Sequence, residues 1–232
     1  MTKKHISSQT EFMALIVYEH RDFLIADKMH GMPTVPLKGQ DSSDTLLGLV
    51  SAEYPEVSKI VGKNPWEGGT LHRLDTATSG LVVFARTQEM YGYLCRIQKE
   101  DLLEKTYRAQ TVEDDRLKGI DLDIQDNKTI KIISYFRSYG RNSKEVRPTQ
   151  DIKRADVPVL YKTIAVKEKD LFTCTITRGF RHQIRAHLAW IGHPIAGDAI
   201  YGNAGTSDVL ELDCFKVRFP MPDGKLFTFA KN

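Results

Sequence analysis

Apolar residues occur along the chain in short runs separated by polar turns. Residues 14–18 and 23–26 are two such runs, and the polar residues 19–22 between them predict a β-hairpin. Residues 81–85 are a continuous apolar run, which is typical of a buried strand. Further strands are expected at residues 103–112, 129–136, 159–166, 171–177, 212–219 and 225–229.

Three segments carry the apolar period of a helix. Asp44 can cap a helix that runs to about Tyr54 and stops at Pro55. A second helix should follow Thr87, and a third should start near Phe180. The expected buried positions of the three helices are Leu46, Leu47 and Val50, then Met90, Tyr93, Leu94 and Ile97, and then Ile184, Leu188 and Ile191.

The order of these elements predicts the fold class and the domain organisation. Strands outnumber helices and follow one another in sequential runs, which favours an α+β fold with a mainly antiparallel or mixed sheet and flanking helices. The chain shows no repeat, low-complexity tract or long Pro/Gly/Ser-rich linker, so we expect one domain over residues 14–232 after a flexible segment 1–13. The polar segment 113–127 is expected to be a surface excursion.

Composition narrows the class of protein. The chain has 232 residues, of which 41% are hydrophobic, and this fraction can fill a globular core. A polar N-terminus and the lack of a run of about 20 apolar residues predict a cytoplasmic protein without membrane contact. Three widely spaced cysteines, Cys95, Cys174 and Cys214, argue against a disulfide framework and a thiolate metal site. The net charge of +3 is too small to indicate a nucleic-acid partner, so such a partner must be argued from local patches.

The segment 71–80, with the sequence LHRLDTATSG, places a cation, an acid and small residues directly before the buried strand at 81–85. In an extended chain Arg73 and Asp75 would share one face, with His72 on the other. Asp75 would then lie beside a guanidinium. The alternative is that Asp75 only turns the chain, as Asp before Thr often does.

This segment resembles the signature of the RluA-type RNA pseudouridine synthases, in which the aspartate of His-Arg-Leu-Asp is catalytic. Two later segments agree with the family in order and spacing. Residues 105–109 (KTYRA) resemble the strand that supplies an active-site tyrosine, here Tyr107. Residues 179–188 (GFRHQIRAHL), with 192–198 (GHPIAGD) and 201–202 (YG) after them, resemble the Gly-Arg-x-His-Gln-Ile-Arg-x-His block, whose last arginine is Arg185 here.

The resemblance covers residues 14 to 230 and implies the pseudouridine synthase fold with a central cleft. Phe180 stands where the family usually has an arginine, and Lys28-Met29-His30-Gly31 replaces a Lys-Pro-x-Gly segment. These departures put one RNA or backbone contact and the rigidity of one loop in doubt. We expect no S4 domain of the kind that some relatives carry at the N-terminus.

The implied reaction moves uracil from an N1 bond to a C5 bond on the same ribose, so it needs no cofactor. It does need an ionised carboxylate at the anomeric carbon, which Asp75 can supply. Whether Asp75 attacks the sugar or takes a proton from it to give a glycal stays open. The resemblance implies that Arg185 pairs with Asp75 and keeps it ionised, and that Tyr107 stacks on the flipped base.

RNA contacts are expected at several basic side chains. His72 and Arg73 would occupy the space of the flipped base or bind neighbouring phosphates. On a helix that starts near Phe180, Arg181 and Arg185 would stand at i and i+4. Like charges at this spacing destabilise a helix, so the pair is reasonable only if it faces an anion. Residues 137–154 hold six cations against two acids, a local excess of four: Arg137, Arg141, Lys144, Arg147, Lys153 and Arg154. Together with Arg178, Arg181 and Arg185, these cations form an expected RNA track.

Two other functions remain as alternatives. His182 and His187 lie at i and i+5, on different faces of a helix, and no third ligand stands at metal-site spacing, so we expect no metal. A non-catalytic RNA-binding module would explain the basic patch but not Asp75. The sequence leaves open whether the substrate is ribosomal or transfer RNA, and we expect a monomer.

Overall fold

The computed structural model describes residues 15–114, 123–124, 128–202 and 207–231. Its contacts divide the chain into two compact units, residues 1–97 (unit 1) and 98–232 (unit 2), and each is described by itself. The predicted flexible segment 1–13 and most of the predicted excursion, residues 115–122 and 125–127, lie outside the described residues.

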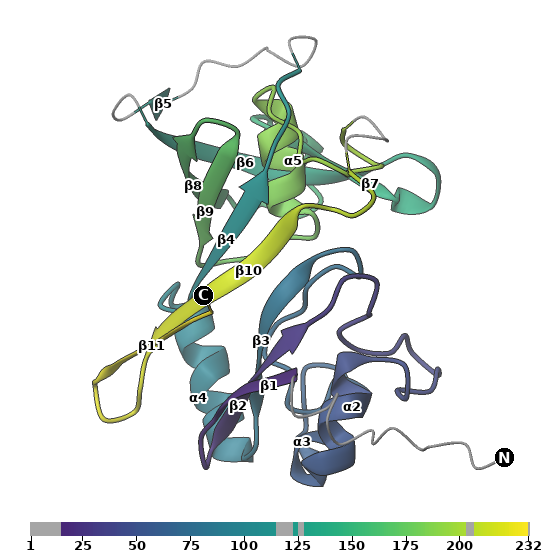
Figure 1. Ribbon diagram of the computed structural model, residues 1–232, viewed down its shortest axis with the longest axis vertical. Helices are drawn as coiled ribbons and strands as arrows, with labels where there is room; N and C mark the ends of the chain where they lie inside the picture. Colours follow the sequence, from purple (N-terminus) through teal and green to yellow (C-terminus); the bar gives the residue numbers. More distant parts are fainter. Residues whose placement is uncertain (1–14, 115–122, 125–127, 203–206, 232) are drawn as a thin grey trace, which may run out of the picture. The chain divides into compact units, whose positions relative to one another are not determined.

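Unit 1 contains a three-stranded antiparallel sheet in the order β1-β2-β3 (Figure 1). The predicted hairpin is confirmed by β1 (Ile16–Glu19) and β2 (Phe23–Lys28). The apolar run at 81–85 lies in β3 (Ser79–Ala85), in which every residue is buried. The loop that carries the His-Arg-Leu-Asp motif therefore leads directly into a strand fixed in the core.

The helices of unit 1 differ from the prediction at their ends. The helices are α2 (Leu46–Glu53), α3 (Pro55–Lys59) and α4 (Gln88–Lys99). Thr45, and not Asp44, caps α2, because its Oγ1 accepts a hydrogen bond from the Gly48 N–H at 3.1 Å. Pro55 opens α3 at its first position, where a missing N–H costs nothing. On α4, Tyr91 is buried in place of the predicted Tyr93.

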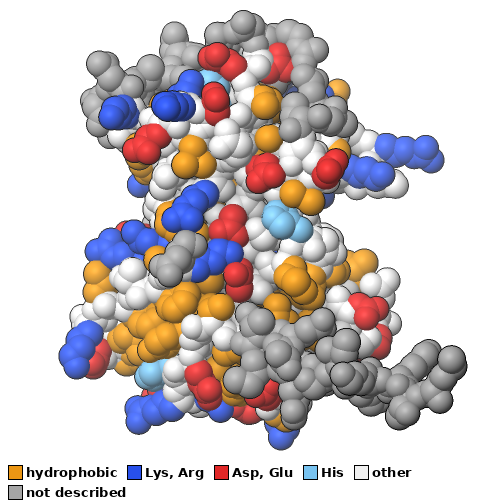
Figure 2. Space-filling view, viewed as in Figure 1, with side chains coloured by type: hydrophobic (Ala, Val, Ile, Leu, Met, Phe, Trp, Pro, Cys, Tyr) orange, Lys and Arg blue, Asp and Glu red, His pale blue; other side chains and the backbone are white. Residues whose placement is uncertain are grey.

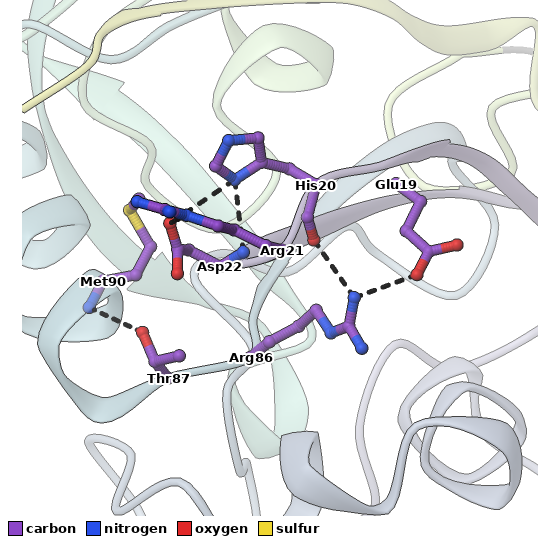
Figure 3. A network of polar contacts seen from close by, with 7 residues as sticks. All are labelled: Glu19, His20, Arg21, Asp22, Arg86, Thr87 and Met90. Atoms are coloured by element: carbon purple, nitrogen blue, oxygen red, sulfur yellow. Dashed lines mark hydrogen bonds and ion pairs between the residues drawn. The ribbon is translucent and has the colours of Figure 1, made fainter. Parts of the chain in front are cut away.

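Arg86 fastens the end of β3 to the β1–β2 turn and to α3. Its guanidinium donates to Glu56 Oε1 at 2.7 Å and to Glu19 Oε1 at 2.9 Å. It also donates to the His20 carbonyl, as Figure 3 shows together with the Glu19 bond. The guanidinium lies over the Tyr54 ring. These contacts connect the β1–β2 turn and α3 to the end of β3, the strand that follows the motif loop.

Unit 2 is built on a larger antiparallel sheet in the order β10-β4-β9-β8-β6-β5, with β11 paired to β10 and β7 paired to β6. Its strands are β4 (Glu104–Gln110), β5 (Asp123–Ile124), β6 (Thr129–Tyr139), β7 (Glu145–Thr149), β8 (Tyr161–Glu168), β9 (Leu171–Ile176), β10 (Leu212–Pro220) and β11 (Leu226–Ala230). Six of them match the predicted runs, whereas β5 and β7 were not predicted. The α+β class with a mainly antiparallel sheet is confirmed.

One helix, α5 (Gln183–Trp190), covers the core of unit 2, where Phe136, Val146, Tyr161 and Ala186 form a buried cluster (Figure 1). The helix starts later than predicted, because His182 adopts a left-handed conformation with φ of 55°. Arg181 therefore lies outside the helix, and the predicted i, i+4 pair with Arg185 was wrong. Among the described residues no helix is long and apolar enough to cross a membrane.

Candidate active site

Asp75 opens a tight turn within the loop that leads to β3. Its backbone carbonyl accepts a hydrogen bond from the Thr78 N–H at 2.9 Å, and its side chain is half-buried. Asp75 is the first residue of this turn, and Thr76 and Ala77 are its central residues. Asp75 therefore does open a turn, and its role as the catalytic carboxylate stays a prediction.

The chain after β2 holds this turn from one side. Thr34 Oγ1 donates to the Leu74 carbonyl at 2.8 Å and accepts from the Leu74 N–H at 3.1 Å. The Gly31 N–H donates to the Thr76 carbonyl at 2.9 Å. His30 Nδ1 lies 2.8 Å from the Ala77 carbonyl. Residues 28–34, which include the departure from the family pattern at residues 28–31, therefore support the loop through backbone and side-chain bonds.

Lys28 lies at the centre of this support and is only 1% exposed. Its ammonium donates to the carbonyls of Met29, Met32 and Thr76 at 3.0, 2.7 and 3.1 Å. Burial lowers the pKa of Lys28 to about 8, and the negative charge of Asp75 opposes this shift by favouring the ammonium. Unit 1 thus supplies its own cation to the surroundings of the Asp75 carboxylate, and sequence reasoning missed this residue.

The other two polar residues of the motif face in different directions. His72 is buried, and its Nε2 accepts from the Val83 N–H on β3 at 3.4 Å. Arg73 is exposed, and its guanidinium pairs with Glu67 Oε1 at 3.0 Å. His72 therefore anchors the loop to the core strand, while Arg73 extends toward solvent beside a carboxylate.

Tyr107 lies in the middle of β4, near the centre of the unit 2 sheet. Its Cα partners are Cys214 on β10 and Cys174 on β9, and the residue is 6% exposed. Lys105 is buried on the same face, and burial lowers its pKa. The predicted shared face of these two side chains is consistent with this burial.

Arg185 is held rigidly on α5 by a second acid of the same unit. Its Nε donates to Asp198 Oδ2 and its Nη2 to Asp198 Oδ1, both at 2.8 Å. The Asp198 carboxylate also accepts from the N–H groups of Ile200 and Tyr201, and it lies at 0% side-chain exposure. Although burial alone would raise the pKa of Asp198, the bonds from Arg185 and these amides lower it.

Tyr201 completes this arrangement. Its ring centroid lies 5.3 Å from the Arg185 guanidinium carbon. Its hydroxyl accepts from the Val146 N–H at 2.8 Å and lies 2.9 Å from His182 Nδ1. The segment after α5 therefore fixes the direction of Arg185 through one carboxylate and one aromatic ring.

Phe180, the second departure from the family pattern, is partly buried and packs against the core cluster. Its ring stacks on Phe136 at 4.9 Å with an interplanar angle of 5° and packs against Tyr161. Its N–H donates to Gln183 Oε1 at 3.0 Å, which helps to start α5. An aromatic side chain is therefore suited to this position, where an arginine would bring a charge into an apolar cluster.

The other predicted RNA contacts lie in unit 2. Arg178 pairs with Asp101 Oδ2 at 3.1 Å, and Arg181 donates to the backbone carbonyls of Ser143 and Glu145. Arg147 on β7 is exposed, and its guanidinium carbon lies 3.2 Å from the centre of the Tyr139 ring. Each of the three keeps N–H donors beyond these contacts, because a guanidinium has five.

The comparisons with known proteins agree with these segments. The family model described as RNA pseudouridylate synthase matches residues 22–190, which include Asp75, Tyr107 and Arg185. The chain belongs to this family.

Relatives and solved structures of this family extend the comparison. A ribosomal large subunit pseudouridine synthase D of Neisseria meningitidis is 29% identical over 208 residues, covering 87% of this chain and 50% of that protein. The protein of the same name from Nitrosomonas europaea is 31% identical over 202 residues, covering 87% and 54%. The chain thus spans about half the length of these curated relatives. The solved structure of human RNA pseudouridylate synthase domain containing 1 shares the fold, with a TM-score of 0.67 at 21% identity over 94% of this chain and 82% of that one.

Within this family the chain carries supporting residues that sequence reasoning did not single out. Asp198 and Tyr201 stand in the segments that resemble the family, yet their contacts with Arg185 span 13 and 16 positions of the chain. Lys28 reaches Thr76 over 48 positions. The only signal for the acid and the lysine would be their burial near a motif arginine or aspartate, and this burial is visible only in the structure. Among the described residues no cluster of three or more His, Cys, Asp or Glu could hold a metal ion.

His187 anchors α5 to β6 and β8, and it provides a pH-dependent prediction. The ring is fully buried, with Nε2 2.9 Å from Ser134 Oγ and Nδ1 2.8 Å from Thr163 Oγ1. Burial lowers the pKa of His187 to about 3, against about 6.5 in an unfolded chain. Between these two values the unfolded chain binds a proton that the folded chain does not, so this residue costs stability as the pH falls below about 6.5.

We expect the wild type to lose up to about 1.4 kcal/mol of unfolding free energy per pH unit, relative to His187→Gln, between pH 6 and about 4.5. Denaturant unfolding of both proteins across this range measures the difference. A difference between wild type and His187→Gln that stays constant with pH would contradict this assignment.

Proposed function

We propose that this chain isomerises uridine to pseudouridine in a structured RNA, with Asp75 as the catalytic carboxylate and Tyr107 and Arg185 as its catalytic partners. The observation that carries the proposal is the way both motifs are held. The Asp75 turn is bonded to residues 28–34 of unit 1, and Arg185 is clamped by Asp198 in unit 2. Both belong to the segment that the family model matches.

The proposed reaction balances without any added group. The bond from ribose C1′ to uracil N1 breaks, the base turns, and C1′ bonds to C5. The hydrogen on C5 leaves as a proton, and N1 gains one. Asp75 serves this sequence either by bonding to C1′ or by taking a proton from the sugar, and in both routes it must start ionised. The Lys28 ammonium interacts electrostatically with this carboxylate.

Tyr107 and Arg185 would act on the base and on the charge of the site. A uridine inside stacked RNA cannot reach a carboxylate, so the nucleotide must be flipped out. An aromatic ring next to the detached uracil keeps water from the sugar. The bidentate bond to Asp198 fixes the direction of the Arg185 guanidinium before substrate binds, which reduces the reorganisation needed in the transition state.

The substrate and its remaining contacts are also proposals. The curated relatives are named for the large ribosomal subunit. We therefore infer a ribosomal RNA substrate, with transfer RNA as the second candidate, a cytoplasmic location and a monomeric enzyme. Arg73, Arg178 and Arg181 would bind phosphates with the N–H donors left beyond their protein contacts, and His72 would contribute while anchored to β3.

Release of tritium from RNA labelled at C5 of uridine tests the activity. Ribosomal and transfer RNA transcripts without natural modifications are incubated with the chain, and tritium in solvent is counted. We expect stoichiometric release from one or a few uridines of one RNA class, with pseudouridine at the same positions. RNA binding without release from either class would instead support the non-catalytic RNA-binding module.

The exposed Arg147 provides a test of the RNA track. We expect Arg147→Ala to reduce the slope of log affinity against log salt concentration by roughly one phosphate contact. Arg96→Ala is the matched control, because Arg96 is also exposed and lies over a tyrosine ring, that of Tyr93 on α4. Binding of a substrate transcript at several salt concentrations measures both slopes. An unchanged slope for Arg147→Ala would remove this residue from the track.

A further inference from the structure

The outer face of β6 and β7 alternates aromatic and basic side chains. Along β6 the residues Ile130, Ile132, Ser134 and Phe136 are buried, which leaves Tyr135, Arg137 and Tyr139 on the opposite, partly exposed face. On β7, Arg147 lies directly opposite Arg137, and Glu145 lies opposite Tyr139. These five side chains are called the β6–β7 face below.

The pairing of Arg137 with Arg147 is unfavourable for the fold alone. Like charges directly opposite each other on one face of a sheet destabilise the pair. Both guanidinium carbons lie over the same ring, 5.4 Å and 3.2 Å from the centre of Tyr139. One carboxylate accompanies them, because Glu145 Oε2 lies 3.8 Å from Arg147 Nη2. A local conflict of this kind is typical of a surface that binds an anion.

The surroundings add positive charge to this face. Arg141 and Lys144 are exposed in the turn between the two strands. Asp156 binds the N–H and hydroxyl of Ser138, whose side chain lies on the other side of β6 from Arg137. Figure 2 shows Lys and Arg side chains projecting from the end of unit 2 that carries this hairpin. Positive side chains therefore outnumber negative ones on the β6–β7 face and in its turn.

An aromatic ring with two guanidinium groups fits unpaired nucleic acid better than an acidic protein. A guanidinium on a ring presents N–H donors at its edge for phosphates and a flat outer side for a base. Tyr139 is 40% exposed and can stack with a base. Carboxylates of a protein would satisfy the arginines but would leave the ring without a stacking partner.

We propose that the β6–β7 face binds an unpaired segment of the RNA substrate, with phosphates at Arg137 and Arg147 and a base stacked on the Tyr139 and Arg147 pair. This inference rests on the proposed function for the identity of the RNA. It assigns substrate recognition to the sheet face opposite the one that packs against α5 and the buried cluster around Phe136. A base in a duplex is already stacked on both sides, so this face should select single strands.

Binding of a fluorescein-labelled, twelve-nucleotide oligoadenylate by the full chain tests the proposal. This probe contains no uridine, so its binding does not depend on turnover. We expect Tyr139→Leu to weaken binding by about fivefold or more, since stacking on one ring contributes about that factor or greater per base. Tyr139→Phe should stay within about twofold of the wild type because it keeps the ring. Arg147→Gln should also weaken binding, because it removes the charge proposed to bind a phosphate.

Three controls make the result specific. Tyr93→Leu removes the ring of another Tyr–Arg pair, on α4, and should leave oligoadenylate affinity unchanged. A blunt RNA duplex of the same length should lose little affinity with Tyr139→Leu. Polyglutamate should bind the wild type and Tyr139→Leu alike. Thermal unfolding of each variant confirms that the exposed position has been changed without loss of the fold.

Several results would overturn the proposal. These are no measurable binding of oligoadenylate, equal affinity of wild type and Tyr139→Leu, an equal loss with Tyr139→Phe, or a matching loss for polyglutamate. The last result would indicate a general anion surface or an acidic protein partner. Normal tritium release with oligoadenylate affinity unaffected by Tyr139→Leu would overturn this inference alone. Absence of release with Tyr139-dependent binding would overturn the proposed activity alone.

Discussion

Asp75→Asn is expected to reduce tritium release by at least about a thousandfold, which corresponds to about 4 kcal/mol of transition-state stabilisation. Asparagine has the same shape but can neither bond to C1′ nor accept a proton from the sugar. The turn should survive, because the Thr78 N–H donates to the backbone carbonyl of residue 75, which the substitution keeps. RNA affinity should stay within about twofold or rise, since a negative charge near the phosphates is removed.

Single-turnover release with excess enzyme separates the chemical step from binding, and filter binding of the same transcript measures affinity. Asp41→Asn is the control, because Asp41 is an exposed acid of the same unit and should keep wild-type rates. Release by Asp75→Asn within tenfold of the wild type would exclude this carboxylate from catalysis. Loss of RNA affinity together with release would assign Asp75 to binding.

Asp198→Ala is expected to lower the free energy of unfolding by about 3–5 kcal/mol at pH 7. The variant leaves the Arg185 guanidinium, at 6% side-chain exposure, without its two carboxylate bonds. It also removes the acceptor for the N–H groups of Ile200 and Tyr201. An uncompensated charge in this position costs more than the pair itself contributes, because desolvation is no longer offset.

A double-mutant cycle identifies the source of that loss. Arg185→Met removes the charge, so Asp198→Ala in that background should cost markedly less than in the wild type. Asp198→Asn should fall between, since it keeps an acceptor but loses the charge. Denaturant unfolding measures each variant. A cost below about 1 kcal/mol for Asp198→Ala, or additive costs in the cycle, would show that the two side chains are not coupled.

The strands of this fold were predictable where apolar runs are dense. Residues 81–85 are continuously apolar, and they form the fully buried β3. In contrast, β7 contains Pro148 and Arg147, and it is stabilised by pairing with β6 across a turn of irregular residues. The residues of β7 alone do not predict this pairing. The start of α5 was misjudged for a similar reason, because the left-handed conformation of His182 is fixed by tertiary contacts.

In the candidate site, too, local motifs were predictable from the sequence and long-range contacts were not. Asp75, Tyr107 and Arg185 were found because their motifs are contiguous in the sequence and resemble a family. Lys28 and Asp198 act on them through contacts between distant positions, and neither position has a local pattern that predicts burial of a charge. The residues proposed to be catalytic were therefore accessible from the sequence, whereas the residues that contact them or their loops required the fold.

Mapping of pseudouridine in total RNA from cells with and without this chain tests the central claim most directly. We predict that one or a few uridines, in ribosomal RNA before transfer RNA, lose the modification when the chain is absent. The wild-type chain should restore it, and Asp75→Asn at equal abundance should not. An unchanged map in its absence, or full restoration by Asp75→Asn, would contradict the assignment of this chain as a pseudouridine synthase that acts through Asp75.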